Sequence, residues 1–262
     1  MKIGQRGTGV PGADVAHPHE VDAVISCLTL CSVGDQATAT RPARRRAVST
    51  HSARPNGILG RLLGRLWIYE TAAINDQAIA LLAASPGDSV LDIGCGPGRA
   101  VAEIARRGAR VTGIAPASGM IAEACRRNAA AILAGQVDVL HGHAGALPVP
   151  EKSYQAALTV HTIYFWDDLD AGLREIRRVP TPGGRLVVAF RPAEHGLPRR
   201  LDPQVYRGPT TNQLTDALRQ SGFTRTTVEQ GEHTTIVVSH VPDDQQPEPF
   251  AHATNTVPKP AT

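Results

Sequence analysis

A strand-like run followed at once by three glycines constrains this chain more than any other feature. Residues 89–98 read SVLDIGCGPG, in which a mostly apolar run precedes Gly94, Gly96 and Gly98. Glycine lets the backbone turn tightly and approach a ligand closely, and a helix that starts directly afterwards presents unpaired N–H groups. We therefore predict a buried strand, a ligand-binding loop and a helix in that order, with Asp92 just before the loop.

Strand and helix patterns alternate along the rest of the chain. Short apolar runs indicate strands over 110–114, 137–142, 154–163 and 184–190, and amphipathic runs indicate helices over 99–108, 118–133 and 167–179. A helix over 211–221 precedes two strands, 224–229 and 234–240, which are close enough to form a hairpin. This alternation predicts an α/β fold with a doubly wound, seven-stranded, mostly parallel sheet whose last strand is antiparallel.

Two local signals refine these bounds. Ser118 stands at the start of its helix and is a suitable N-cap, because its hydroxyl accepts hydrogen bonds from unpaired backbone N–H groups. Pro182, Gly183 and Gly184 form a turn-like sequence, so we expect a turn just before the fifth strand.

The segment before the first glycine-rich strand repeats apolar residues at helical spacing over 57–84. We expect helices there, lying over the carboxyl ends of the strands, which is the edge where open α/β sheets bind ligands. Together with the alternating region, this segment defines one predicted domain at 56–241.

Both ends of the chain differ from this domain in composition. Residues 1–55 are rich in Gly, Pro, Ala, Thr and Arg, and residues 242–262 are rich in proline with few core-forming residues, so we expect a poorly ordered N-terminal extension and a disordered tail. Within the extension, 21–46 aligns without gaps to 154–179, which indicates a partial repeat of the fourth strand and its helix.

Charge and apolar patterning argue against two classes of partner. The formal net charge is only +3 and the basic residues are spread out apart from the run 44–46, so we expect no nucleic acid partner. No apolar stretch approaches the roughly 18 residues of a membrane helix, so we expect no membrane partner. The run 23–33 is similar to a signal-peptide core, but the acids Asp14, Glu20 and Asp22 before it argue against that role.

The four cysteines indicate neither a disulfide framework nor a metal site. They include no C-x-x-C pair, which is typical of a protein from the reducing cytoplasm. Cys27 and Cys31 with His17 and His19 match no common zinc-finger spacing, so we expect no metal and interpret these cysteines as buried apolar residues.

The glycine spacing favours one kind of ligand over another. The pattern is G-x-G-x-G rather than G-x-G-x-x-G, and Asp92 lies two residues before the first glycine. A carboxylate beside the loop would repel a pyrophosphate but would attract a ligand with a positive amino group. A plain helix-capping turn in a generic α/β protein is the alternative interpretation.

Several motifs in order resemble the class I methyltransferases that use S-adenosylmethionine. SPGDSVLDIGCGPG at 85–98 resembles the family's glycine-rich motif, REIRRVPTPGGRLVV its later helix and fifth strand, and TNQLTDALRQSGFTRTTVE its last helix and sixth strand. The resemblance covers about 57–241 and implies a Rossmann-like methyltransferase fold with S-adenosylmethionine as cofactor. It implies that Gly94, Gly96 and Gly98 wrap the methionine part, and that Asp92 orients the loop or meets the amino group through water.

One family position is occupied by the wrong residue type. In the family, the second strand ends in an acid that accepts hydrogen bonds from both ribose hydroxyls, and this position is Ala115 here, followed by Pro116. We expect cofactor affinity to be lower by about one to three decades, since water replaces such hydrogen bonds only in part. The resemblance also places Ala144 and Val160 at the cofactor.

The adenine position differs as well. The family usually has an acid there, and this chain has His143 in the sequence Gly-His-Ala. A neutral imidazole accepts a hydrogen bond from an amino group and a protonated one does not, so we expect cofactor binding to weaken in acid. An ordinary exposed loop histidine is the alternative. Gln155 and Pro180 are further departures, and together with Ala115 they leave open a degenerate, non-catalytic relative.

The acceptor side is expected after the fourth strand. His161 could serve as general base there, and Tyr164 with its aromatic neighbours could shelter a sulfonium by cation–π attraction. A packed aromatic corner is the alternative. We predict methyl transfer to a small-molecule acceptor, in which positioning supplies most of the rate. A nicotinamide-dependent oxidoreductase is disfavoured, because it too needs an acid for its ribose.

Overall fold

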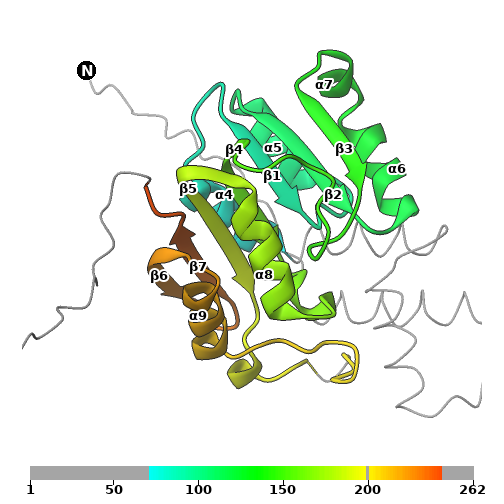
Figure 1. The fold of residues 1–262 in the computed structure, drawn as a ribbon. Helices are drawn as coiled ribbons and strands as arrows, with labels where there is room; N and C mark the ends of the chain where they lie inside the picture. Colours follow the sequence, from blue (N-terminus) through cyan, green and yellow to red (C-terminus); the bar gives the residue numbers. More distant parts are fainter. Residues whose placement is uncertain (1–70, 199–200, 244–262) are drawn as a thin grey trace, which may run out of the picture.

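The computed structural model describes residues 71–198 and 201–243, which form a single mixed sheet flanked by helices (Figure 1). The predicted N-terminal extension, its partial repeat, the first part of the helical segment 57–84 and most of the tail lie outside the described residues. The strand order is β3-β2-β1-β4-β5-β7-β6. The strands are β1 Ser89–Ile93, β2 Arg110–Ala115, β3 Val137–His141, β4 Tyr154–Val160, β5 Pro180–Phe190, β6 Thr224–Gln230 and β7 Thr235–His240.

Strand directions confirm the predicted sheet. The first five strands pair in parallel, with β1 between β2 and β4. The last strand, β7, is antiparallel both to β5 and to β6. Because β1 is central, its carboxyl end lies between the ends of β2 and β4, and the glycine loop starts there.

Helices cover both faces of the sheet, with α8 and α9 in front of it in Figure 1 and α4 and α5 behind it. The helices are α4 Ala72–Leu82, α5 Arg99–Arg106, α6 Ser118–Arg127, α7 Ala129–Leu133, α8 Leu169–Arg178 and α9 Thr211–Gln220, with short 3-10 turns η1 Ile163–Phe165 and η2 Ala193–His195. Alternate residues of β1 enter different cores. Val90 packs with α4 and α5, whereas Leu91 packs with α8 and α9. A strand that is buried on both faces is expected to be mostly apolar, and in β1 Val90, Leu91 and Ile93 are apolar and buried, whereas Asp92 is a buried exception.

Polar side chains start the two helices of the front layer. The Asp168 carboxylate accepts a hydrogen bond from the Ala171 N–H at 2.9 Å and so caps α8. Thr210 and Gln213 form a reciprocal capping box at the start of α9. These caps fix where the segments after β4 and β5 join their helices.

Two predicted details are wrong. The helix expected over 118–133 is divided at Asn128, and its N-cap is Ala117 rather than Ser118, with no side-chain cap. The Asn128 side chain donates to the Ala124 and Gly98 carbonyls, at 2.8 Å and 3.2 Å, and this side-chain bonding competes with the regular helix.

The fifth strand is also longer than expected. β5 begins at Pro180 and runs through the predicted turn, because Gly183 takes a positive φ of 73° and the pairing register shifts between Tyr154 and Ala156. The irregularity absorbs the turn-like residues without ending the strand.

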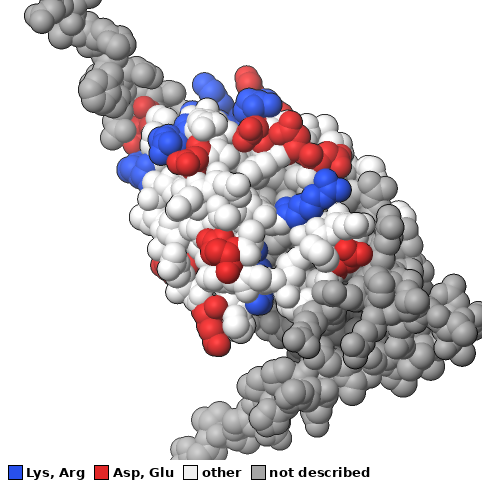
Figure 2. All heavy atoms as spheres, turned by 90° about the horizontal axis from the view of Figure 1, so that it is seen from below, with Lys and Arg blue, Asp and Glu red and all other residues white. Residues whose placement is uncertain are grey.

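The described surface carries both signs of charge, and Figure 2 shows basic side chains beside acidic ones on the face that it draws. Within residues 71–198 and 201–243, no helix has the length and apolar character needed to cross a membrane. The same residues contain no group of three or more His, Cys, Asp or Glu side chains suited to hold a metal ion.

Candidate functional site

The first glycine of the loop is fixed by its neighbours. The N–H groups of Gly94 and Cys95 both donate to the Ile114 carbonyl of β2, at 2.8 Å and 2.9 Å. Gly94 has a φ of 80°, and a Cβ built on it would lie 2.2 Å from Thr162 Cγ2. The loop therefore lies tightly between β2 and the segment after β4, and only glycine fits at this position.

The other two glycines have different surroundings. Gly98 precedes α5, and a Cβ there would lie 2.6 Å from Asn128 Nδ2, so protein packing again requires glycine. Gly96 has a φ of 52°, and a Cβ there would meet nothing within 4 Å. Packing fixes the two outer glycines, whereas the middle one borders open space in which a ligand could approach the backbone.

Asp92 is a buried carboxylate without a full set of partners. Its side chain is 3% exposed on the central strand, and among the described residues its Oδ2 atom has no hydrogen-bond donor. Burial raises the pKa of Asp92 from 3.8 to about 7. A buried carboxylate is strongly stabilised by a cation or a donor, so the strand end fits a ligand with a positive amino group.

The end of β2, where we predict the ribose position, has no acid. Ala115 is 2% exposed and packs in the core, and its carbonyl accepts a hydrogen bond from the Gly142 N–H at 3.2 Å. Pro116, which follows it, is exposed. The side chain at 115 is a methyl group and contributes no hydrogen bond to any ligand.

The predicted adenine residues, His143 and Ala144, lie in the segment after β3. His143 is exposed and forms an isolated antiparallel bridge with Ala146, whereas Ala144 is buried. His141, the last residue of β3, pairs with Ala115. The segment is thus directly beside the end of β2, and the imidazole of His143 is free to meet solvent or a ligand.

The segment after β4 contains the predicted acceptor residues. Val160 is half-buried and pairs with Ala189 of β5, and the His161 N–H donates to the Ala189 carbonyl at 2.8 Å. His161 has a φ of 56°, a left-handed conformation that is uncommon outside glycine and is frequent at functional sites.

Tyr164 connects this segment to β5. Its hydroxyl lies 2.9 Å from His161 Nδ1 and accepts a hydrogen bond from the Arg191 N–H. Burial raises the pKa of the Tyr164 phenol, and burial followed by the Arg191 charge lowers the pKa of His161 to about 4. Tyr164 also packs with Phe165 and Tyr206, at ring-centroid distances of 5.9 Å and 5.6 Å.

Three residues of this site were not identified from the sequence. Asn128 and Thr162 hold the glycine loop, and Arg191 holds Tyr164. A signal for Asn128 existed, because asparagine is a poor helix former in the middle of a predicted helix. Thr162 and Arg191 act through contacts that depend on strand pairing and carry no local signal.

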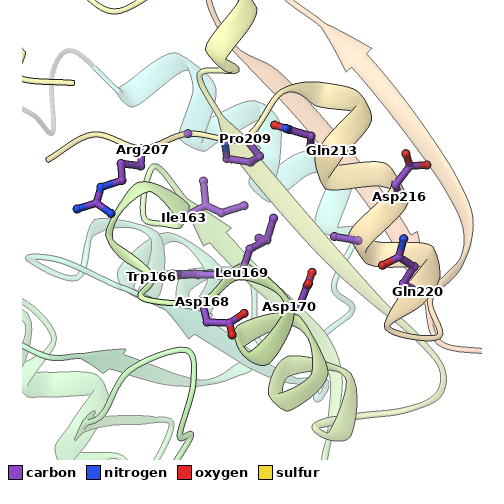
Figure 3. Close-up of a pocket in the computed structure, with 12 residues that line it drawn as sticks. Ile163, Trp166, Asp168, Leu169, Asp170, Arg207, Pro209, Gln213, Asp216 and Gln220 are labelled. Atoms are coloured by element: carbon purple, nitrogen blue, oxygen red, sulfur yellow. The ribbon is translucent and has the colours of Figure 1, made fainter. Parts of the chain in front are cut away.

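A separate cavity of about 500 Å³ lies between α8 and α9 (Figure 3). Ile163, Trp166 and Leu169 line one side of it, and Pro209, Gln213 and Asp216 the other. The glycine loop does not contribute to its lining. This cavity therefore belongs to the helical layer of the front face and is distinct from the strand-end site.

Comparison with known proteins shows what part of the chain resembles. The family model of the methyltransferase domain matches residues 91–188. An O-methyltransferase of Aspergillus sclerotiorum is 34% identical over 120 residues, which cover 45% of this chain and 46% of that protein. An O-methyltransferase of Pyrenophora dematioidea is 30% identical over 158 residues, covering 56% and 58%. The chain thus matches about half the length of these curated relatives.

A solved structure agrees with these sequence matches. The crystal structure of an S-adenosylmethionine-dependent methyltransferase from Thermotoga maritima, described as a possible histamine N-methyltransferase, has a TM-score of 0.53 and 26% identity. The match covers 63% of this chain and 87% of that one. The sheet order, the glycine loop after β1 and the matched relatives agree: residues 91–188 match the methyltransferase domain, and the chain is similar to S-adenosylmethionine-dependent methyltransferases in sequence and in fold.

Proposed function

We propose that the protein transfers a methyl group from S-adenosylmethionine to an oxygen atom of a small-molecule acceptor. The observation that carries this proposal is the pairing of an open backbone position with an unsatisfied buried carboxylate at one strand end. Gly96 leaves space for a ligand, and Asp92 Oδ2 lacks a donor among the described residues. The amino acid part of S-adenosylmethionine, whose nitrogen is positively charged, would fit the space at Gly96 and supply the donor that Asp92 lacks. We infer an oxygen atom as the acceptor because two matched relatives are named O-methyltransferases.

The chain's own residues would hold the cofactor in defined ways. The backbone of Gly94, Gly96 and Gly98 would surround the methionine part, and Asp92 would accept a hydrogen bond from its amino group, directly or through water. When bound, S-adenosylmethionine supplies a methyl group on a positively charged sulfur. Pro116, Ala144 and Val160 would border the adenosine part, and His143 would accept from the adenine amino group.

A matched pair of glycine variants tests this proposal. Gly96 and Gly135 both have positive φ, 52° and 68°, and both have no atom within 4 Å of an added Cβ. Replacement by alanine should therefore cost each variant a similar 1 to 2 kcal/mol, an approximate penalty for alanine in this conformation. Only Gly96→Ala places a methyl group where the ligand would lie, so calorimetry should show weaker S-adenosylmethionine binding for it alone. Equal binding by both variants would contradict the proposed site.

A second candidate function is a non-catalytic relative with weak cofactor binding, which Ala115 favours. Ala115→Asp restores the family's acid and should tighten binding about ten- to a thousandfold. The variant buries a carboxylate in the free protein, so circular dichroism must first show that it is folded. No tightening in a folded variant would mean that the ribose site is misplaced. No calorimetric signal from folded wild type at millimolar ligand would favour the non-catalytic candidate.

A further inference from the structure

Three residues at the ends of β4 and β5 form a hydrogen-bonded series with a definite direction. The Arg191 backbone N–H can only donate, so the Tyr164 oxygen accepts there. A phenol has one hydrogen, and the other partner within reach of this hydroxyl is His161 Nδ1 at 2.9 Å. Among the described residues no other acceptor competes for that hydrogen. Tyr164 therefore donates to Nδ1.

This direction decides which nitrogen of His161 carries hydrogen. Burial and the nearby Arg191 charge lower the pKa of His161 to about 4, so the imidazole is neutral around neutral pH. A neutral imidazole has one N–H group, and Nδ1 already accepts from Tyr164. The hydrogen is then on Nε2. Within the described part of the chain, Nε2 has no hydrogen-bond partner.

The fold brings this donor to the edge that holds the glycine loop. β4 pairs directly with β1, and His161 is the first residue after β4. Its neighbour Thr162 contacts Gly94 so closely that an added Cβ would lie 2.2 Å away. His161 is half-buried, and its backbone is fixed by the hydrogen bond to Ala189. A ligand in the loop and an acceptor beside it would meet this residue.

We propose that His161 acts as a hydrogen-bond donor through Nε2 rather than as a base, and that the methyl acceptor is a carboxylic acid. The proposal rests on the proposed methyl transfer. In that step, an oxygen lone pair forms the new bond to the methyl carbon, and the carbon–sulfur bond breaks with its electron pair left on sulfur. A carboxylate oxygen is already ionised and releases no proton, so no base is needed. Nε2–H and the positive charge of Arg191 would both stabilise that anion.

Tyr164 is a positioning residue in this scheme, because its hydrogen bond to His161 Nδ1 fixes the ring hydrogen on Nε2. Its test is a spectroscopic measurement on the full chain without ligands. In ¹⁵N-histidine-labelled protein near neutral pH, long-range correlation spectra should show His161 with hydrogen on Nε2, and His161→Gln identifies the signals. Tyr164→Phe should change this to a mixture of tautomers. Hydrogen on Nδ1, or a doubly protonated ring, in wild type would overturn the proposal whether or not the variant folds.

Activity measurements on His161 variants distinguish a hydrogen-bond donor from a general base. Methyl-labelled S-adenosylmethionine is offered with benzoate and benzyl alcohol, cinnamate and cinnamyl alcohol, and octanoate and octanol. Label should enter methyl esters of an acid. His161→Gln keeps an N–H donor and should retain most of the rate, whereas His161→Ala should lose about ten- to a hundredfold. His233→Gln, at an exposed loop position, is the matched control.

The outcomes distinguish this proposal from the one on which it rests. Transfer to an alcohol but not to its acid would overturn the acid assignment. So would no transfer to any acid by protein that binds S-adenosylmethionine in calorimetry. Equal loss in His161→Gln and His161→Ala would overturn the donor role. Absent cofactor binding would instead overturn the proposed function, and the tautomer measurement would still decide the direction of the hydrogen bonds.

Discussion

Asp92 should make the free protein less stable as the pH rises, and Asp92→Asn should remove this effect. The carboxylate is buried and its Oδ2 has no donor among the described residues, so the neutral form is favoured in the folded protein. Burial raises its pKa from 3.8 to about 7. Asparagine is close in size and stays uncharged, so it reproduces the neutral acid at every pH.

The size of the pH effect on stability follows from the pKa shift of Asp92. Because the folded pKa is raised, the stability associated with the neutral acid is complete below 3.8 and is lost as the pH rises to about 7. In that range the unfolding free energy falls by about 1.4 kcal/mol per pH unit, and above it the loss levels off. The stability difference between Asp92→Asn and wild type should therefore be about 2 kcal/mol larger at pH 8 than at pH 5.5.

The assay is urea unfolding of ligand-free protein at several pH values, with Asp138→Asn as control. Asp138 lies on β3 and is exposed, so its replacement makes the same chemical change without removing a buried carboxylate. Other titrating groups are common to wild type and variant and cancel in the comparison. A pH-independent difference for Asp92→Asn would refute the reasoning, because it would mean that the ionised carboxylate already has a compensating donor.

Two further substitutions test the packing around the site. Gly94→Ala should destabilise the fold by about 2 kcal/mol or more, because the added Cβ meets Thr162 in a left-handed conformation, and Thr162→Ser should recover part of this loss in the double variant. Thermal unfolding measures both. Thr210→Ala should cost about 1 kcal/mol by removing the cap of α9, and Thr210→Ser, which keeps the hydroxyl, should cost less; urea unfolding separates the two.

The sheet could be predicted from the sequence because its strands have strong local signals. The run at 89–93 is mostly apolar, with Val90, Leu91 and Ile93, and a strand buried on both faces favours this pattern. The glycines after it marked the loop, since a positive φ at Gly94, Gly96 and Gly98 suits glycine above other residues. The hairpin of β6 and β7 was equally clear from two short β-rich runs with a short connection.

The errors arose where tertiary contacts decide the local structure. Ser118 is a good N-cap by type, yet Ala117 takes that position, and Asn128 divides the helix because its side chain bonds to Gly98 across the site. The site shows the same limit. His161 and Tyr164 were named as candidates, but their proposed roles depend on the hydrogen bond from Arg191, a residue at another strand end that sequence spacing does not connect to them.

If the proposed ribose site is correct, Ala115 should affect cofactor affinity more than the rate of transfer. The ribose lies away from the reacting sulfur and carbon, so a carboxylate that holds it would bind the starting complex and the transition state equally well. Losing such an interaction raises KM and leaves kcat unchanged. A methyl group at 115 is therefore compatible with catalysis at sufficient cofactor concentration, and Ala115→Asp should lower KM for S-adenosylmethionine without raising kcat. A rise in kcat with unchanged KM would show that position 115 acts on the transfer step itself.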